Sequence, residues 1–245
     1  MSFEFLAFPD AEQAIPRGCP FLSCFLLGKQ KKVYDKKKKI NLNIYMNKNL
    51  FSKLILILFF LPLFSYADSP LTSTHICDVY TDVDMVVKAE KSGKVTRTIT
   101  DFLLSKDNSI DEKAAAINAI GWKFEGTDNA EKFCKYAYGK PLSEIKTDEL
   151  SSDELFCIGY LQALGDYFNP DKALPYLEAA RRKDNRSLTV ALILALVKAQ
   201  SIMDKGDWCK MWGITRDVLD DASLYQDMRE GAKKIIKDYM ILYKC

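Results

Sequence analysis

The sequence predicts an all-α fold in which helix-turn-helix hairpins stack on one another and disulfide bonds brace them. Beyond residue 67, segments of about 12 to 20 residues repeat apolar positions at helical spacing, and short polar turns separate them. No stretch alternates apolar and polar residues over enough positions to indicate a sheet. The same part of the chain holds five of its seven cysteines. We therefore expect residues 68–245 to form a single helical domain, either an α-solenoid-like array or an irregular helical bundle.

The first 45 residues show neither a helical nor a strand period. They include a lysine run at residues 36–39, a pattern that also occurs in membrane-surface and nucleic-acid patches. We interpret residues 1–45 as a non-native or disordered upstream extension, and Met46 as the functional start.

Residues 46–67 have the three parts of a secretory signal peptide. A short cationic start is followed by an apolar core of 11 residues at 54–64 and by a polar end with the small residues Ser65 and Ala67. The core has about half of the roughly 20 residues that a helix needs to cross a bilayer. We therefore expect cleavage after Ala67, a periplasmic or secreted product, and no stable membrane insertion after cleavage.

Removal of this leader changes the sign of the net charge. The first 67 residues carry 10 Lys and Arg against 4 Asp and Glu, whereas residues 68–245 carry 25 against 29. Binding to phosphate backbones requires a concentrated basic surface, which an acidic balance does not favour. We therefore expect no nucleic-acid partner.

Three of the expected helices begin after polar residues that can accept hydrogen bonds from the free N–H groups of a first turn. Ser109 precedes the helical segment 113–122, Ser151 and Ser152 precede 153–168, and Asn169 precedes 172–183. A last helix is expected near the end of the sequence, where apolar residues recur at spacings of three and four. Its apolar face consists of Leu224, Met228, Ala232, Ile235, Ile236, Tyr239 and Met240.

A helix-turn-helix unit is expected at least twice, because residues 119–140 resemble residues 163–183 after a one-residue gap. The matched positions hold small residues, which let two helices approach, and large apolar or aromatic residues, which fill the space between them. Ala119, Ile120, Gly121 and Phe124 match Ala163, Leu164, Gly165 and Phe168, and Ala130, Phe133 and Ala137 match Ala173, Tyr176 and Ala180. A third unit is expected over residues 188–219.

The unit at 163–183 resembles the tetratricopeptide and Sel1-like repeat families. The likeness rests on Leu164, Gly165 and Phe168 in the first helix and on Ala173, Leu177 and Ala180 in the second. It extends over roughly residues 110–220, with turns between helices that are shorter than in either family. The resemblance implies an α-solenoid that binds a protein or peptide along its concave side.

Five cysteines lie beyond the expected cut, namely Cys77, Cys134, Cys157, Cys209 and Cys245. Cysteines tend to pair in an oxidising, exported setting, so we expect two bridges and one thiol left over. Our first pairing is Cys134 with Cys157, on helices that would pack together, and our second is Cys209 with Cys245, which would tie the last helix back to the bundle. The alternative is that some of them are buried thiols that behave as small hydrophobes.

The residues do not indicate catalysis, a cofactor or a metal site. Residues 68–245 contain one histidine, His75, and no C-x-x-C pair, so a zinc pattern is missing. His75 and Cys77 are two residues apart and would not face each other on a helix. Carboxylate pairs such as Asp220 with Asp221 fall at expected turns, where charged groups are usually solvated. We therefore expect a protein that is not an enzyme.

A candidate interaction surface combines aromatic residues with a basic run at the end of an expected helix. Its members are Trp122, Tyr160, Tyr167, Arg181, Arg182 and Arg186. The alternative is that most of the aromatic residues, namely Trp122, Phe124, Tyr136, Tyr138, Tyr160, Tyr167, Trp208 and Trp212, are core residues, which their helical spacing favours.

The expected function is therefore that of an exported helical-repeat protein that binds another protein or a peptide. One alternative is a periplasmic immunity or inhibitor protein directed against a cell-wall-degrading toxin. A second is a hydrolase, which would require His75 or clustered carboxylates in a concave site.

Overall fold

A computed structural model describes residues 69–122, 128–203 and 205–245, and within these ranges the fold is all-α, with no strand, as predicted. The expected upstream extension and signal peptide, residues 1–67, lie outside the described residues. All described helices fall in the second of the two units into which the chain divides, residues 65–245. The α-helices are α3 (Asp84–Ser92), α4 (Arg97–Leu104), α5 (Ile110–Ile120), α6 (Asn129–Tyr138), α7 (Ser152–Gly165), α8 (Leu174–Lys183), α9 (Leu188–Met203), α10 (Trp208–Leu219) and α11 (Glu230–Met240).

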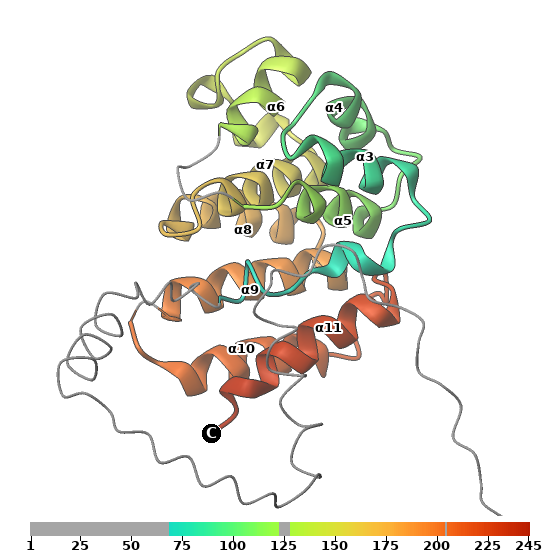
Figure 1. Ribbon diagram of the computed structural model, residues 1–245. Coiled ribbons are helices and arrows are strands. Elements are labelled where there is room, and N and C mark those ends of the chain that lie inside the picture. The colour runs from blue at the N-terminus through green and yellow to red at the C-terminus, as the bar shows by residue number, and fades with distance from the viewer. Residues whose placement is uncertain (1–68, 123–127, 204) are drawn as a thin grey trace, which may run out of the picture. The chain divides into compact units, whose positions relative to one another are not determined.

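The helices pack in layers (Figure 1). Two hairpins, α7 with α8 and α9 with α10, make the most extensive helix–helix contacts. Helix α9 lies between the α7–α8 hairpin on one side and α10 with α11 on the other (Figure 1). Short 3₁₀ turns extend these elements, including η2 (Ile76–Val79) before α3 and η6 (Ile241–Tyr243) directly after α11. None of the helices in the described ranges combines the length and apolar character that a bilayer crossing requires.

Helices α7 and α9 lie in the core and are buried over most of their length. Ten of the 14 residues of α7 and 13 of the 16 residues of α9 are buried. A helix that is hydrophobic all round must be enclosed by others. Outer helices bury one face only, as α11 does with Ala232, Ile236 and Met240.

The predicted repeat is correct in part. The hairpins at 163–183 and 188–219 form as expected, as α7 with α8 and α9 with α10. The helices on either side of the predicted turn at 119–140 do not pair, because α5 packs mainly on α3 and α7, whereas α6 packs on α7 and α4. Residues 123–127, with the matched Phe124, lie outside the described residues. The small residues of α5 therefore serve contacts with helices other than the next one in the chain.

The predicted helix starts differ in how they are capped. Ser151 forms a capping box, in which its hydroxyl accepts a hydrogen bond from the Glu154 N–H at 3.3 Å and its own N–H donates to the Glu154 carboxylate at 2.8 Å. Ser109 begins α5 without such a bond, and its hydroxyl donates to the Asp111 carboxylate instead. Asn169 precedes a 3₁₀ turn, η5 (Pro170–Lys172), and α8 begins only at Leu174.

Residues 69–83 tie the first helices to the last one. Asn118 of α5 accepts a hydrogen bond from the Cys77 N–H at 3.1 Å, and its amide donates to the Thr74 carbonyl at 3.1 Å. Arg229, which precedes α11, pairs with Asp82 through both terminal nitrogens. Its guanidinium also lies over the Tyr80 ring, 4.3 Å from the centroid. This segment therefore closes the bundle across about 150 residues of sequence.

Candidate functional site

Five apolar and aromatic residues lie at the start of α10 and at the end of α11 with the η6 turn, which packs on α10, and we call them the α10–η6 surface. They are Trp208, Tyr239, Ile241, Leu242 and Tyr243. Trp208 is 46% exposed, Ile241 41% and Leu242 71%, which places three large apolar side chains in solvent. Large exposed apolar groups that lie together mark interaction sites more often than isolated ones do.

Ring contacts order this surface. The Trp208 and Tyr243 rings stack with centroids 5.7 Å apart and planes 14° apart. Tyr239 meets Tyr243 edge-on at 5.6 Å, and the two hydroxyl oxygens are 2.7 Å apart. Aromatic pairs in such arrangements contribute about 0.5–1.5 kcal/mol beyond their buried area. These contacts hold the Trp208, Tyr239 and Tyr243 side chains in place.

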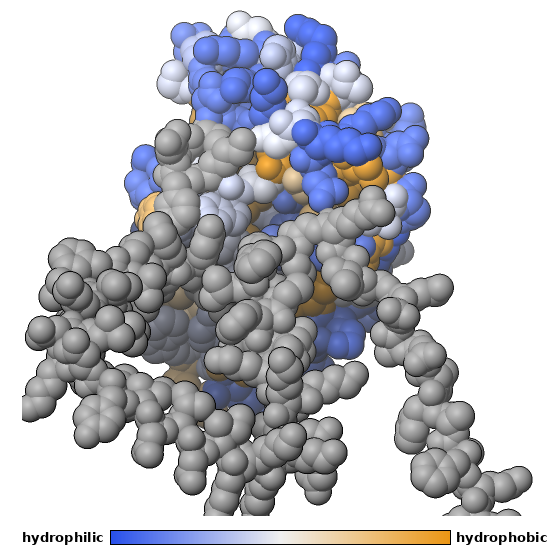
Figure 2. All heavy atoms as spheres, viewed as in Figure 1, coloured by the Kyte–Doolittle hydropathy of each residue, from blue (hydrophilic) through white to orange (hydrophobic). Residues whose placement is uncertain are grey.

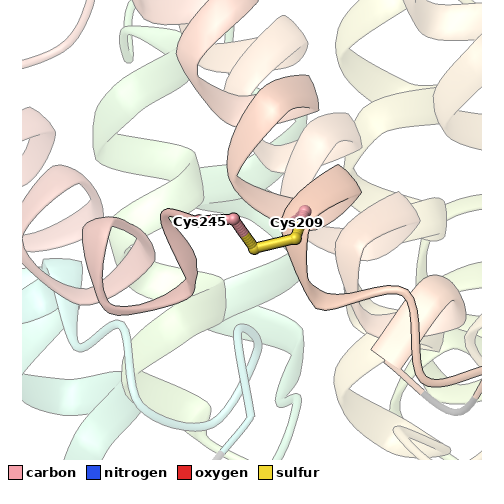
Figure 3. The surroundings of a disulfide bond; sticks show 2 residues. All are labelled: Cys209 and Cys245. Carbon is pink, nitrogen blue, oxygen red and sulfur yellow. A yellow bond between two sulfur atoms is a disulfide. The ribbon is translucent and has the colours of Figure 1, made fainter.

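A disulfide between Cys209 and Cys245 restrains the backbone that carries this surface. It joins the start of α10 to the segment that follows α11, with the two Cα atoms 5.4 Å apart (Figure 3). This is the second of the two pairings predicted from the sequence, and it is confirmed. Helix α10 also packs directly on η6, so the bond and the packing hold the same two elements together.

The first predicted pairing, Cys134 with Cys157, is wrong. Both residues are buried free thiols, and Cys77 is a half-buried free thiol. Helices α6 and α7 do pack together, as the prediction assumed, but proximity of two helices does not by itself place two sulfur atoms within bonding geometry. The alternative reading, in which buried cysteines act as small hydrophobes, describes Cys134 and Cys157.

The candidate surface predicted from the sequence does not come together. Tyr160 and Tyr167 are each 1% exposed and belong to the core, which corrects their assignment to a surface. Trp122 is half-buried and meets the Tyr167 ring edge-on at 4.8 Å. These aromatic residues therefore support packing around α7.

The basic residues of that prediction lie around the end of α8. Arg181 donates a hydrogen bond to the Asp184 carbonyl at 3.3 Å, and Arg182 is exposed. Arg186 lies 5.5 Å from the centroid of the exposed Tyr225 ring. The three arginines thus occupy a helix end and its following turn.

Burial raises the pKa of the free thiols. The pKa of Cys77 rises from 9.0 to about 12 because the thiol is desolvated and lies near Asp78 and Glu90. The pKa of Cys134 rises to about 12, also through desolvation, and that of Cys157 rises further still. A thiolate is the nucleophilic form of cysteine, so these shifts oppose nucleophilic chemistry at neutral pH.

Cys77 should therefore react slowly and with an unusual pH dependence. In the folded protein at pH 8 its thiolate fraction is roughly a thousandfold below that of an unperturbed cysteine. We expect labelling by iodoacetamide, followed by mass spectrometry of the Cys77 peptide, to accelerate about tenfold per pH unit well above pH 9. In urea-unfolded protein the rate should instead level off near pH 9. A plateau at pH 9 in the folded protein would contradict the shift.

The same shifts set the sign of a stability change. Because the folded pKa lies above the unfolded value of 9.0, the free energy of unfolding includes a contribution that is fully present below pH 9. That contribution is lost as the pH rises from about 9 towards 12.

Metal-ligand clusters and ligand-sized cavities are two further kinds of site to consider among the described residues. Among these residues no three His, Cys, Asp or Glu side chains are grouped so that they could hold a metal ion. A small hollow of about 80 Å³ lies beside the end of α6, lined by Tyr138, Lys140, Glu144, Ile145, Lys146, Glu149 and Leu150. Sites for small organic ligands are usually several times larger, about 300–1,000 Å³. The surface over α4 and α6 that Figure 2 shows is mainly hydrophilic.

Comparison with known proteins adds no relative: no family model, no curated protein and no solved structure matches this chain.

Proposed function

We propose that this chain is an exported, non-catalytic helical protein that binds another protein through its α10–η6 surface. The observation that carries the proposal is the exposure of Trp208, Ile241 and Leu242 next to a disulfide, with Trp208 stacked on Tyr243. Trp and Tyr are enriched among the residues that dominate binding energy at protein interfaces. The signal peptide expected at residues 46–67 supports export.

Preorganisation is the second support for this role. Binding costs free energy when flexible side chains and loops become ordered, by about 0.5–1.5 kcal/mol for each immobilised side chain. Trp208 and Tyr243 are already stacked, and the Cys209–Cys245 bond already restrains the segment that carries Tyr243. Binding at this surface therefore costs less free energy than binding at a surface whose side chains must first become ordered.

The test compares Trp208→Ala with Tyr225→Ala in the full chain. Loss of a Trp at the centre of an interface costs about 2 kcal/mol or more, which corresponds to an affinity roughly 30-fold weaker. The variants and the parent chain are immobilised, exposed to periplasmic extract, and compared by quantitative mass spectrometry. The captured partner's dissociation constant is then measured by calorimetry.

Tyr225 is the matched control because it is 67% exposed and lies away from the surface. Tyr225 forms an isolated β-bridge with Ser187, which lies just before the start of α9. Trp208 follows the other end of that 16-residue helix. We expect Tyr225→Ala to retain the partner and Trp208→Ala to lose it. Equal capture by the two variants would refute the proposed surface. A cell-wall-degrading toxin among the retained proteins would identify the role as inhibition.

A further inference from the structure

The Cys209–Cys245 disulfide is placed where a reductant can reach it. Both half-cystines are exposed, whereas the free thiols of Cys134 and Cys157 are buried. Exposed disulfides can undergo exchange without unfolding and are commonly the labile, regulatory ones. The bond also restrains a small element, because residues 241–245 follow a helix that is anchored by its own buried face.

We infer that this disulfide is a site of reversible reduction by a dithiol protein, and that its cleavage releases residues 241–245 from α10. Thiol–disulfide exchange proceeds by attack of a thiolate on one sulfur, while the other sulfur leaves as a thiolate. Which sulfur leaves depends on which thiolate is better stabilised.

Cys209 is the better leaving group because of its place in α10. It is the second residue of a 12-residue helix, where free N–H groups and the helix dipole favour a negative charge. Asp207 occupies the N-cap position but makes no side-chain cap hydrogen bond, so it leaves the first-turn N–H groups to other acceptors. Lys210 follows directly and is exposed. Cys245 lies outside any helix and lacks this stabilisation.

The exchange therefore begins at Cys245. A thiolate of the reductant attacks Cys245 Sγ, the S–S bond breaks, and its electron pair remains on Cys209 Sγ. The second thiol of the reductant then attacks the reductant's own sulfur in the mixed disulfide and expels Cys245 as a thiolate. The reductant is oxidised to a disulfide by two electrons, and its two protons end on Cys209 and Cys245.

Reduction alters the α10–η6 surface at its centre. Tyr243 stacks on Trp208 only while the segment that carries it lies against α10. The oxidised form is therefore the one that presents the complete surface, and a dithiol protein switches it off. This consequence rests on the proposed binding function, whereas the chemistry at the disulfide does not.

The first test measures the reduction rate of the full chain by dithiothreitol. Folded and urea-unfolded samples are quenched with iodoacetamide, and peptides carrying Cys209 and Cys245 are quantified by mass spectrometry. We expect the folded protein to be reduced within tenfold of the unfolded rate. A folded rate more than tenfold slower would mean that the bond needs unfolding to be reached, and would overturn the inference.

The direction of attack is read with reduced glutathione, quenched early with N-ethylmaleimide. We expect glutathione on Cys245 and N-ethylmaleimide on Cys209. Glutathione mainly on Cys209 would overturn the assignment of the leaving group. A Cys77→Ser variant should give the same pattern, because Cys77 is outside the bond.

The extent of release is measured on the reduced and alkylated chain by circular dichroism and hydrogen exchange. We expect the helical signal to persist while amides at 208–212 and 239–245 exchange at least tenfold faster. Unchanged exchange, or loss of the whole helical signal, would overturn a local release. These readouts need no partner, so their failure leaves the Trp208 test standing, and failure of the Trp208 test leaves the redox chemistry standing.

Discussion

Replacing Asp153 by alanine should lower the free energy of unfolding by about 3 kcal/mol. Its partner is Lys113 of α5, whose side chain is 1% exposed and whose Nζ lies 2.5 Å from the Asp153 carboxylate. Removing Asp153 leaves a buried ammonium without a counter-charge, which typically costs about 3–5 kcal/mol. We expect the lower end of that range because Asp153 is itself 43% exposed and water can partly replace it. Urea titration monitored by circular dichroism measures the change.

Two controls separate the buried pair from general charge effects. Lys146 and Glu149 form a pair whose side chains are 76% and 69% exposed, so Glu149→Ala should change stability by less than about 0.5 kcal/mol. Asp153 also lies in the first turn of α7, where a carboxylate contributes about 0.3–1 kcal/mol through the helix dipole. The double variant Lys113→Met, Asp153→Ala still loses the helix-dipole contribution of Asp153, but it no longer contains the unpaired, buried ammonium of Lys113. It should therefore recover most of the stability, and a double variant no better than Asp153→Ala would contradict the argument.

The all-α class and the hairpins at the α7–α8 and α9–α10 pairs could be predicted from sequence because their signals are local. Ser151 precedes Glu154 at the spacing of a capping box, and both bonds of that box form. Apolar periodicity and short turns are enough to predict helices that double back on one another. The same signals predicted a hairpin at 119–140, where tertiary packing of α5 on α3 and α7 decided otherwise.

The site could not be predicted, because its members depend on position in the bundle. Tyr160 in α7 and Tyr167, two residues after its end, are core residues, which agrees with the core alternative that the helical spacing of the aromatic residues favoured. Ile241 and Leu242 are exposed because they follow Met240, the last residue of the buried face of α11. An apolar pair just past the end of an amphipathic helix was the signal that could have indicated this surface. Lys113 likewise finds its partner 40 residues away, beyond the reach of local patterns.

Gly159 should tolerate no side chain, although it lies in the middle of a helix. A Cβ there would lie 2.7 Å from Leu177 Cγ and 3.1 Å from the Leu177 backbone nitrogen, so α7 and α8 pack with almost no space between them. Alanine has the better helix propensity by about 1 kcal/mol, but relief of the overlap requires movement of α8. We therefore expect Gly159→Ala to lower the free energy of unfolding by about 1–3 kcal/mol.

At Gly213 of α10 the same substitution should have the opposite effect on the free energy of unfolding. A Cβ at Gly213 would meet no atom within 4 Å, so Gly213→Ala gains helix propensity without a clash and should raise stability by up to about 1 kcal/mol. Urea titration of the two variants should thus move their midpoints in opposite directions. Midpoints that move in the same direction would mean that α8 shifts at little cost to accommodate the Cβ that the substitution adds at Gly159. Opposite shifts would mean that the spacing of the α7–α8 hairpin is fixed by the close approach of the two helices at Gly159.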